Sequence, residues 1–507
     1  MKKMIKVKPR KLNEKKGNKN NKDGDIMKVR VRYAPSPTGY LHIGGARTAL
    51  FNYLFAKNNK GQFIVRIEDT DLERNITDGI SSQLDNLRWM GIIPDETIDI
   101  PGEYGPYKQT ERLDIYLKYA HELIKNKQAY YCFCTSETLD KMREDQTANN
   151  ISAFQYDKRC LKLDNKTITN NLQKKVSYTI RIIIPDDKIY TIADLVRGNV
   201  EFKTQDLGDF IIIKSNGVAT YNFAVVIDDH LMEISHVFRG EEHLSNTPRQ
   251  LVIYEYFKWT PPVFAHMTLI VNSDRKKLSK RDGSLMQFIH QYRQEGYLPA
   301  AIFNFIALLG WSSHEEKEIY SKEQLIKLFT PKYLSKAPSM FDPQKLLWIN
   351  NQYIKQLTSK QYLTLVIPFI KTKYNWSSNS SEWWAEMLII YQPQLEYGVQ
   401  INELVTLFFK NNYQLEVDAK TFMKENDCKN VCTTFINKIA VCQAWTNDNI
   451  KTIINEVKTE TKVNGKLLFM PIRIISTGQM HGPDLVSTIK LLGYDTISKN
   501  LKLNFKK

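Results

Sequence analysis

The segment that most constrains this chain is residues 34–47, with the sequence Ala-Pro-Ser-Pro-Thr-Gly-Tyr-Leu-His-Ile-Gly-Gly-Ala-Arg. It follows residues 28–33, where charged and apolar side chains alternate as in a strand with one buried face, and it precedes an apolar stripe at helical spacing. Gly44 and Gly45 lack side chains where that helix would begin, and the free N–H groups of a helix N-terminus favour anions. The segment therefore predicts a phosphate-binding turn, with His42 donating to phosphate oxygens.

A cationic segment far along the chain, residues 277–281, has the sequence Lys-Leu-Ser-Lys-Arg. Taken alone, this segment is typical of a solvated surface loop. The segment at residues 34–47, also taken alone, is typical of a turn with a purely structural role. Together they meet the needs of a site that acts on the α-phosphate of ATP, because backbone approaches the phosphates from one side and mobile positive charge from the other. Lys277 and Lys280 would then stabilise the charge on the α-phosphate and pyrophosphate by roughly 3 kcal/mol each.

The first 90 residues predict the opening of a parallel α/β sheet. A strand at residues 28–33, the turn, a helix and a second strand at residues 63–67 follow one another, and ligands of such sheets bind at the carboxyl ends of the strands. Residues 221–227 form an almost uninterrupted apolar run, which predicts a strand buried on both faces. Residues 131–219 differ in composition and predict an insertion with strands near residues 176–184 and 210–213. From about residue 285 the pattern is mostly helical.

Length and composition narrow the class of protein. A chain of 507 residues exceeds one hydrophobic core, so several domains are expected, and its longest apolar stretch is too short to span a bilayer. Six cysteines in this length do not predict a disulfide framework, which favours a reducing compartment. The net charge of +16 includes +7 in residues 1–26. The remaining positive charge is compatible with an RNA partner. The basic segment at residues 1–26 is predicted to be a disordered tail, and the alternatives are a tail that adds affinity for RNA or one that targets the protein to an organelle.

Both motifs resemble the signatures of class I aminoacyl-tRNA synthetases. Longer strings are similar to the bacterial-type glutamyl-tRNA synthetases: Arg-Ile-Glu-Asp-Thr-Asp at residues 66–71, Tyr-Lys-Gln-Thr-Glu-Arg at residues 107–112, and the segments 221–250 and 469–493. The resemblance implies an α/β class I Rossmann-like catalytic domain with an α+β insertion, followed by mostly α-helical stem-contact and anticodon-binding domains.

The domain boundaries that we expect place the tail at 1–26, the two catalytic halves at 27–112 and 221–268, the acceptor-binding insertion at 113–220, the stem-contact region at 269–355 and the anticodon-binding region at 356–507.

The resemblance also implies a two-step reaction. L-Glutamate attacks ATP, with Mg²⁺, to give glutamyl-adenylate and pyrophosphate, and the glutamyl group then passes to the terminal adenosine of tRNA(Glu). A monomer in the cytoplasm, without membrane association, is expected. A glutaminyl-tRNA synthetase, a glutamyl-queuosine tRNA synthetase and a non-catalytic tRNA-binding paralogue are the alternatives. The helical C-terminal half disfavours a glutaminyl-tRNA synthetase, and the chain length disfavours a glutamyl-queuosine tRNA synthetase. The intact phosphate motifs disfavour a non-catalytic paralogue.

The family pattern assigns roles to residues of the amino-acid pocket. Glu68 is expected to hold the ammonium group, and Arg32 and Arg239 to bind the carboxylates, since a planar guanidinium binds a carboxylate bidentately. Each of these three also fits an ordinary ion pair at a strand end. Further residues expected at the site are Ser36 and Tyr221 in the amino-acid pocket, and His42, Gly44, Gly45, Glu242 and Lys280 at ATP. The chain has Val225 where the family pocket can carry Asn.

A cysteine-rich part of the insertion suggests a metal site. Some family members bind zinc here, and Cys132, Cys134, Tyr156 and Cys160 are the candidate ligands, although phenolate is an uncommon zinc ligand. A metal-free structural knuckle is the alternative. His230, His236 and His266 are expected to have supporting rather than catalytic roles, and the C-terminal aromatic residues to belong mainly to the core.

Overall fold

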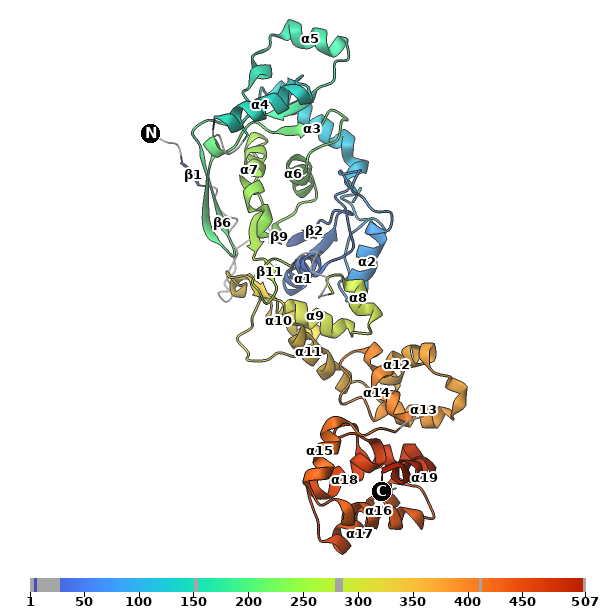
Figure 1. Cartoon of the computed structure of the whole chain (residues 1–507). Coiled ribbons are helices and arrows are strands. Elements are labelled where there is room, and N and C mark those ends of the chain that lie inside the picture. Colours follow the sequence, from blue (N-terminus) through green and yellow to red (C-terminus); the bar gives the residue numbers. More distant parts are fainter. Residues whose placement is uncertain (1–3, 7–27, 150–153, 279–285, 410–412, 505–507) are drawn as a thin grey trace. The chain divides into compact units, whose positions relative to one another are not determined.

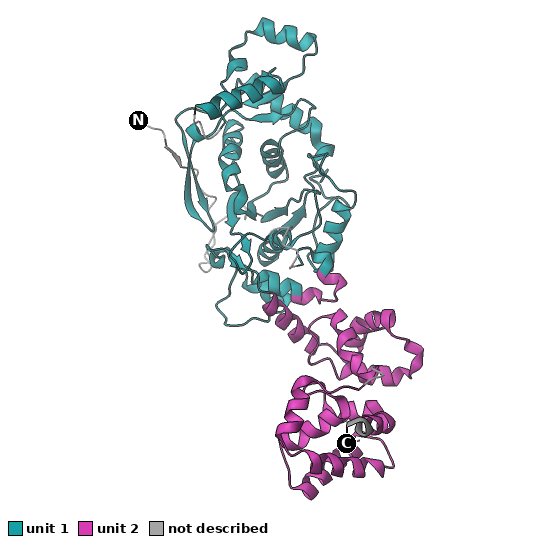
Figure 2. Ribbon diagram, viewed as in Figure 1, with its two compact units in different colours: residues 1–291, 302–342 teal, residues 292–301, 343–507 magenta. Residues whose placement is uncertain are grey.

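The computed structural model describes residues 4–6, 28–149, 154–278, 286–409 and 413–504. The chain forms two compact units: residues 1–291 with 302–342, and residues 292–301 with 343–507. Figure 2 colours the two units separately. The finer division into six segments stays a prediction.

A four-stranded parallel sheet in the order β10-β9-β2-β3 forms the centre of the first unit. Its strands are β2 (Arg30–Tyr33), β3 (Gln62–Val65), β9 (His236–Gly240) and β10 (Val263–Met267). Helix α1 (Ile43–Asn58) packs on β2, β3 and β9, and its apolar side chains are buried. The parallel sheet that the sequence predicts from residues 28–67 is therefore confirmed, and two further strands come from residues 236–267.

The run at residues 221–227 is a helix, so the prediction of a strand there is wrong. It forms α6 (Tyr221–Leu231), which packs against α7 (Thr247–Tyr256) and α3 (Leu113–Lys125). An uninterrupted apolar run lacks the period that separates a doubly buried strand from a helix buried on all sides. The extended backbone of Thr220 precedes the helix, and residues 223–229 are all buried.

The insertion contains helices and antiparallel strands, as expected. One sheet has the order β4-β5-β8, with β4 (Ala129–Cys132), β5 (Thr179–Ile182) and β8 (Ile211–Ile213). The hairpin of β6 (Ile189–Asp194) and β7 (Gly198–Lys203) forms a second sheet with β1 (Met4–Lys6). The other residues of the predicted N-terminal tail lie outside the described part of the chain. Two helices complete the insertion, α4 (Ser136–Ala148) and α5 (Asn165–Gln173).

The first unit has further helices and short strands, and two of these helices extend into the second unit. They are α2 (Gly79–Trp89), the short strands β11 (Ile270–Val271) and β12 (Ser339–Met340), and the helices α8 (Ile289–Gln294), α9 (Pro299–Ala307) and α10 (Lys322–Leu328).

The second unit is helical, as the sequence predicts. Its main helices are α11 (Pro343–Lys355), α12 (Ser359–Lys373), α13 (Ser381–Ile389), α14 (Ile401–Leu404), α15 (Val417–Glu425), α16 (Lys429–Ala440), α17 (Asn447–Thr461), α18 (Lys466–Thr477) and α19 (Leu485–Asn504). Trp384 is fully buried and Trp383, Phe408 and Phe409 pack around its cluster, which confirms these aromatic residues as core. Trp348 is exposed. In the described part of the chain, no helix has the length and apolar character to cross a bilayer.

Candidate active site

A cavity of about 510 Å³ opens at the carboxyl ends of β2 and β9. This size suits a nucleotide and a small substrate. Ten of the residues expected at the site line it: Arg32, Ser36, His42, Gly44, Gly45, Glu68, Tyr221, Arg239, Glu242 and Lys277. Lys280, with Ser279 and Arg281, lies outside the described residues. The structure therefore brings the described part of the predicted site together in one cavity.

His42 is the N-cap of α1, and its ring orientation follows from that role. The backbone N–H of Gly45 donates to His42 Nδ1 at 3.1 Å. In the neutral ring, the proton is then on Nε2, which makes that atom a donor. A side chain at Gly45 would meet the hydroxyl of Tyr33 at 2.7 Å, so glycine is required for this close approach. Glycine backbone and an imidazole donor thus meet at one helix N-terminus.

Gln83 on α2 holds the turn in shape, and sequence reasoning did not identify it. Its side-chain amide donates to the carbonyl oxygens of Ser36 and Gly39 at 3.2 and 2.9 Å. Its own carbonyl oxygen accepts from Tyr33 at 3.4 Å. The turn's irregular backbone is therefore fixed by a buried side chain from another helix.

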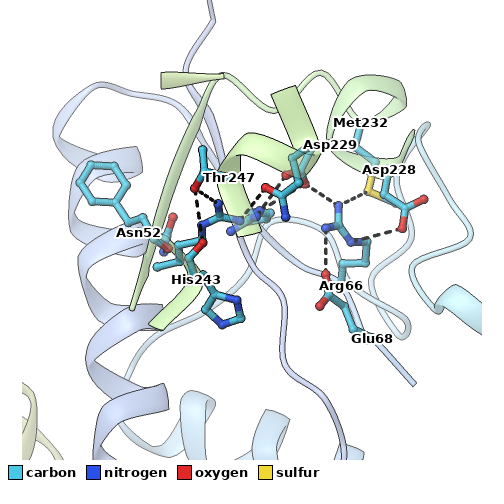
Figure 3. A network of polar contacts seen from close by, with 12 residues as sticks. Asn52, Arg66, Glu68, Asp228, Asp229, Met232, His243 and Thr247 are labelled. Carbon is cyan, nitrogen blue, oxygen red and sulfur yellow. Dashed lines mark hydrogen bonds and ion pairs between the residues drawn. The ribbon is translucent and has the colours of Figure 1, made fainter. Parts of the chain in front are cut away.

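Arg66 organises a buried network of charges behind the cavity. Figure 3 shows its guanidinium between Glu68 on one side and Asp228, Asp229 and Met232 on the other. Arg66 donates to Asp229 at 2.8 Å and to Glu68 at 3.2 Å, and lies 3.5 Å from Asp228. Because its side chain is fully buried, these contacts hold Glu68 in place at the pocket wall. Burial raises the pKa of Glu68, against the attraction of Arg66 and Arg32.

Arg32 is paired with a carboxylate of the protein. Its Nε and Nη2 atoms donate to the two carboxylate oxygens of Asp229 at 3.2 and 3.1 Å. Asp229 is the last-turn residue of α6 that also accepts from Arg66. The charges of Arg32 and Arg66 are therefore balanced largely inside the protein.

Arg239 differs from these arginines because it donates its hydrogen bonds to neutral groups. It donates to His266 Nε2 at 3.0 Å, to Gln250 Oε1 at 2.9 Å and to Thr247 Oγ1 at 2.8 Å. No carboxylate among the described residues forms an ion pair with it, although its side chain is buried. Burial lowers the pKa of the Arg239 guanidinium. A buried cation without a partner anion is a strong attractor for a carboxylate ligand.

Three arginines behind the cavity are balanced by three carboxylates. Arg32, Arg66 and Arg112 form ion pairs with Glu68, Asp228 and Asp229, whereas Arg239 reaches a carboxylate, Asp194, only through His266. His243, which lines the cavity, and the buried His266 are both expected to be neutral. Burial lowers the pKa of His243 to about 4 and also lowers the pKa of His266. A carboxylate of a ligand would supply the directly paired anion that Arg239 lacks.

Tyr221 lies at the first turn of α6, where it contacts the cavity. Its hydroxyl is 3.1 Å from Nδ1 of His243. Val225, one turn further along α6, is buried and has no hydrogen-bonding group. The pocket contact that Asn provides in some family members is therefore absent here.

Lys277 lies on a hairpin next to β11. Leu278 N–H donates to Ile270 O, and Asn272 N–H donates to Lys276 O, which together fix the hairpin. The exposed side chain of Lys277 lines the same cavity as His42. The turn and the described part of the cationic motif, which are distant in sequence, thus face one cavity.

The four candidate metal ligands lie together in the insertion. The sulfur atoms of Cys132, Cys134 and Cys160 are within 4.8 Å of one another. Tyr156 Oη is 3.4 Å from the sulfur of Cys132 and 3.2 Å from that of Cys134. Hydrogen bonding from Cys160 lowers the pKa of Cys132 to about 4, and burial raises the pKa of Tyr156. Three cysteine sulfur atoms within reach of one ion are chemically suited to zinc.

Sequence reasoning gave no role to Arg66, Asp194 or Asp229, because their partners are distant in sequence. Arg66 and Asp229 are separated by 163 residues, and His266 and Asp194 by 72. The one available signal was that Asp228 and Asp229 end a buried apolar run. Charged residues at such a position need buried partners.

The fold and the site define a class of enzyme. The family described as tRNA synthetases class I (E and Q), catalytic domain, matches residues 28–348, and the family Anticodon binding domain matches residues 361–503. The chain belongs to the class I tRNA synthetases of the E and Q group.

Relatives of this chain within the class have the more specific name glutamate–tRNA ligase. A glutamate–tRNA ligase of Geobacillus thermodenitrificans is 53% identical over 478 residues, which cover 94% of this chain and 98% of that protein. The glutamate–tRNA ligase of Bacillus subtilis is 48% identical over 483 residues, covering 94% of this chain and 99% of the relative. A crystal structure of a glutamate tRNA ligase from Elizabethkingia meningosepticum, in complex with its amino acid, has a TM-score of 0.85 at 33% identity. That comparison covers 94% of this chain and 99% of the other.

Proposed function

We propose that this protein is a glutamate–tRNA ligase. It activates L-glutamate with ATP to glutamyl-adenylate and pyrophosphate, and transfers the glutamyl group to the 3′-terminal adenosine of tRNA(Glu). The single observation that carries the choice of amino acid is Arg239, a buried guanidinium held by neutral acceptors and unpaired with any carboxylate of the described residues. The relatives named glutamate–tRNA ligase support the same choice.

In this proposal each charged group of glutamate has a partner. Glu68 binds the ammonium group, Arg239 and Arg32 bind the two carboxylates, and Ser36 and Tyr221 complete the pocket. The second carboxylate of glutamate supplies an anion for Arg239, which has no directly paired carboxylate among the described residues. Glutamine keeps only its α-carboxylate, so it would leave one of these two arginines without a substrate anion, which is unfavourable for a buried charge. The presence of two arginines therefore favours the dicarboxylic substrate.

ATP lies against the other part of the cavity. Gly44 and Gly45 let its phosphates approach the N-terminus of α1, and His42 donates from Nε2. Glu242 contacts the nucleotide near the ribose, and Lys277 stabilises the α-phosphate and the departing pyrophosphate. Lys280 has the same role by resemblance. ATP brings Mg²⁺, which neutralises phosphate charge when bound. The protein forms no covalent intermediate, so catalysis depends on positioning and fixed charge.

The test is ATP–pyrophosphate exchange with glutamate or glutamine, with tRNA(Glu), with tRNA(Gln) and without tRNA. Exchange that depends on glutamate and is at least about 100-fold weaker with glutamine supports the proposal. Preference for glutamine would make the chain a glutaminyl-tRNA synthetase, and no exchange with either amino acid would favour the non-catalytic tRNA-binding alternative. Aminoacylation of each tRNA shows whether tRNA(Gln) is also charged with glutamate.

The remaining assignments follow from this function. The 113–220 insertion binds the acceptor end, the 269–355 region contacts the stem, and the 356–507 region binds the anticodon; the family match at residues 361–503 supports the last of these. The protein acts as a monomer in the cytoplasm. Sedimentation of the purified chain alone and with tRNA(Glu) tests the stoichiometry.

Zinc completes the cofactor proposal. Cys132, Cys134, Cys160 and Tyr156 would hold one structural ion, which crosslinks β4 to the segment 156–162. Metal analysis of protein purified without chelator tests it: about one zinc per chain is expected in the native protein and in Cys442→Ser, and clearly less in Cys160→Ser. Absence of metal from the native protein would leave a metal-free cluster of thiols around Tyr156.

A further inference from the structure

The orientation of Arg239 depends on a histidine directly across the sheet. Arg239 on β9 and His266 on β10 are register partners, and Arg239 Nε donates to His266 Nε2 at 3.0 Å. Both side chains are buried, with His266 fully inaccessible. The Nη1 and Nη2 atoms of Arg239 each donate one further hydrogen bond, to Gln250 and Thr247 respectively, which leaves a second N–H on each atom for a ligand. His266 therefore supplies one of three acceptors that fix the plane of the guanidinium.

His266 can accept from Arg239 only in one protonation state. Its Nδ1 atom is 2.6 Å from Asp194 Oδ2, so the proton on Nδ1 is donated to Asp194 and Nε2 keeps its lone pair. Burial lowers the pKa of His266, and the nearby Arg239 and Arg197 also disfavour the charged ring, while Asp194 opposes them. The neutral ring with its proton on Nδ1 is the form that this geometry requires.

Asp194 is itself fixed by backbone groups. Its Oδ1 atom accepts from the N–H groups of Val196 and Arg197, both at 2.9 Å, and its Oδ2 atom accepts from His266 N–H at 3.1 Å. Asp194 ends β6 in the insertion, and Leu195 N–H donates to Phe264 O of β10. The residue that sets the His266 tautomer thus belongs to the insertion, while the arginine it serves belongs to the catalytic sheet.

We propose that His266, held by Asp194, is a positioning residue for the substrate carboxylate: it aims the guanidinium of Arg239 at the pocket and keeps its surroundings uncharged. The proposal rests on the proposed function, because it takes Arg239 to bind a carboxylate of glutamate. It ties the insertion to amino-acid binding through one chain of three side chains.

Two substitutions of His266 separate positioning from packing. His266→Asn keeps a donor near the place of Nδ1 for Asp194 but removes the acceptor that faces Arg239. His266→Gln places an amide oxygen near the place of Nε2, where it can accept from Arg239. We expect His266→Asn to raise the KM for glutamate about tenfold and His266→Gln less than about threefold, with the KM for ATP nearly unchanged in both.

Asp194→Asn tests the tautomer without changing the histidine. The amide oxygen is expected to stay with the two backbone N–H groups at Val196 and Arg197, so the NH₂ group faces His266 Nδ1. His266 must then carry its proton on Nε2, pointing it at Arg239. We expect a rise of about tenfold in the KM for glutamate and little change in the KM for ATP.

The matched control is His236→Asn. His236 is a buried histidine of β9 whose ring contacts Ser235 and Phe55 rather than Arg239. It should lower the unfolding temperature without changing either KM. Equal effects of His266→Asn and His266→Gln on glutamate KM, or an equal rise in ATP KM, would overturn the positioning role. Native protein without glutamate-dependent exchange would instead overturn the proposed function, so the two failures are distinguishable.

Discussion

Arg32 and Asp229 form a two-pronged ion pair, with Nε and Nη2 of the arginine 3.2 and 3.1 Å from the two carboxylate oxygens. Asp229 also accepts from Arg66, so one carboxylate fixes two arginines at the back of the pocket. Since both partners are buried, the pair also links the end of α6 to β2.

Asp229→Asn should therefore destabilise the first unit strongly. Removing one partner of a buried ion pair leaves an uncompensated charge and costs about 3 kcal/mol or more. Calorimetric unfolding should show a lower midpoint for the transition of this unit. Asp85→Asn is the control, because Asp85 is an exposed partner of Arg88 at 3.9 Å and should change stability little. Equal midpoints for the two variants would contradict the structural role of Asp229.

Arg239→Ala should impair the use of glutamate far more than the use of ATP. Loss of a charge-assisted contact to a carboxylate predicts a fall of about 100-fold in kcat/KM for glutamate. Initial rates of pyrophosphate exchange at varied glutamate and at varied ATP measure the two effects. Arg143→Ala, at an exposed arginine of α4, should leave both unchanged. An unchanged KM and turnover for glutamate in Arg239→Ala would refute its role.

Lys277→Ala should slow adenylate formation without weakening tRNA binding. A fixed positive charge beside the reacting phosphate predicts a loss of about 100-fold in rate. Single-turnover adenylate formation and a filter-binding assay with tRNA(Glu) measure the two properties. The neighbouring Lys276→Ala provides the control, because Lys276 is exposed and does not line the described cavity. A parallel loss of rate and tRNA affinity would mean that the hairpin is only a scaffold.

The affinity for glutamate should depend on pH through Glu68. Burial raises the pKa of Glu68 above its ordinary value of 4.5, and the substrate ammonium group pairs only with the ionised carboxylate. As pH falls through this raised pKa, Glu68 takes up a proton, the attraction is lost and the KM for glutamate rises.

Glu68→Gln isolates this effect. The variant should have a high KM that changes less between about pH 7.5 and about pH 5.5 than that of the native protein, because the titration of glutamate itself is common to both. The KM is measured by exchange at each pH. Parallel pH profiles would show that Glu68 does not bind the ammonium group.

The sequence predicted the phosphate-binding part of the site well, because that part is local. The turn at residues 34–47 contains its own glycines, its histidine and its helix start, and each has a short-range signature. The two parallel strands also have local signatures. Residues 28–33 alternate between charged and apolar side chains, residues 63–67 are mainly apolar, and both strands end at the site.

The parts that could not be predicted depend on contacts between distant segments. Arg239 is surrounded by neutral acceptors because Gln250 and His266 lie beside it. The pairing of β9 with β10 places His266 there, and the packing of α7 places Gln250 there. The apolar run at residues 221–227 predicts a strand, but a run buried on all sides has no period that separates a strand from a helix. Their helical form became visible only from the elements packed around them.

Helix α6 has a functional group at each end: Tyr221 enters the cavity at its first turn, and Asp228 and Asp229 bind arginines at its last. Each residue added to a helix advances it by about 1.5 Å and rotates it by about 100°. A single insertion or deletion between these ends would therefore turn either the tyrosine or the aspartates away from their targets. The two ends of α6 together therefore fix the number of residues between them.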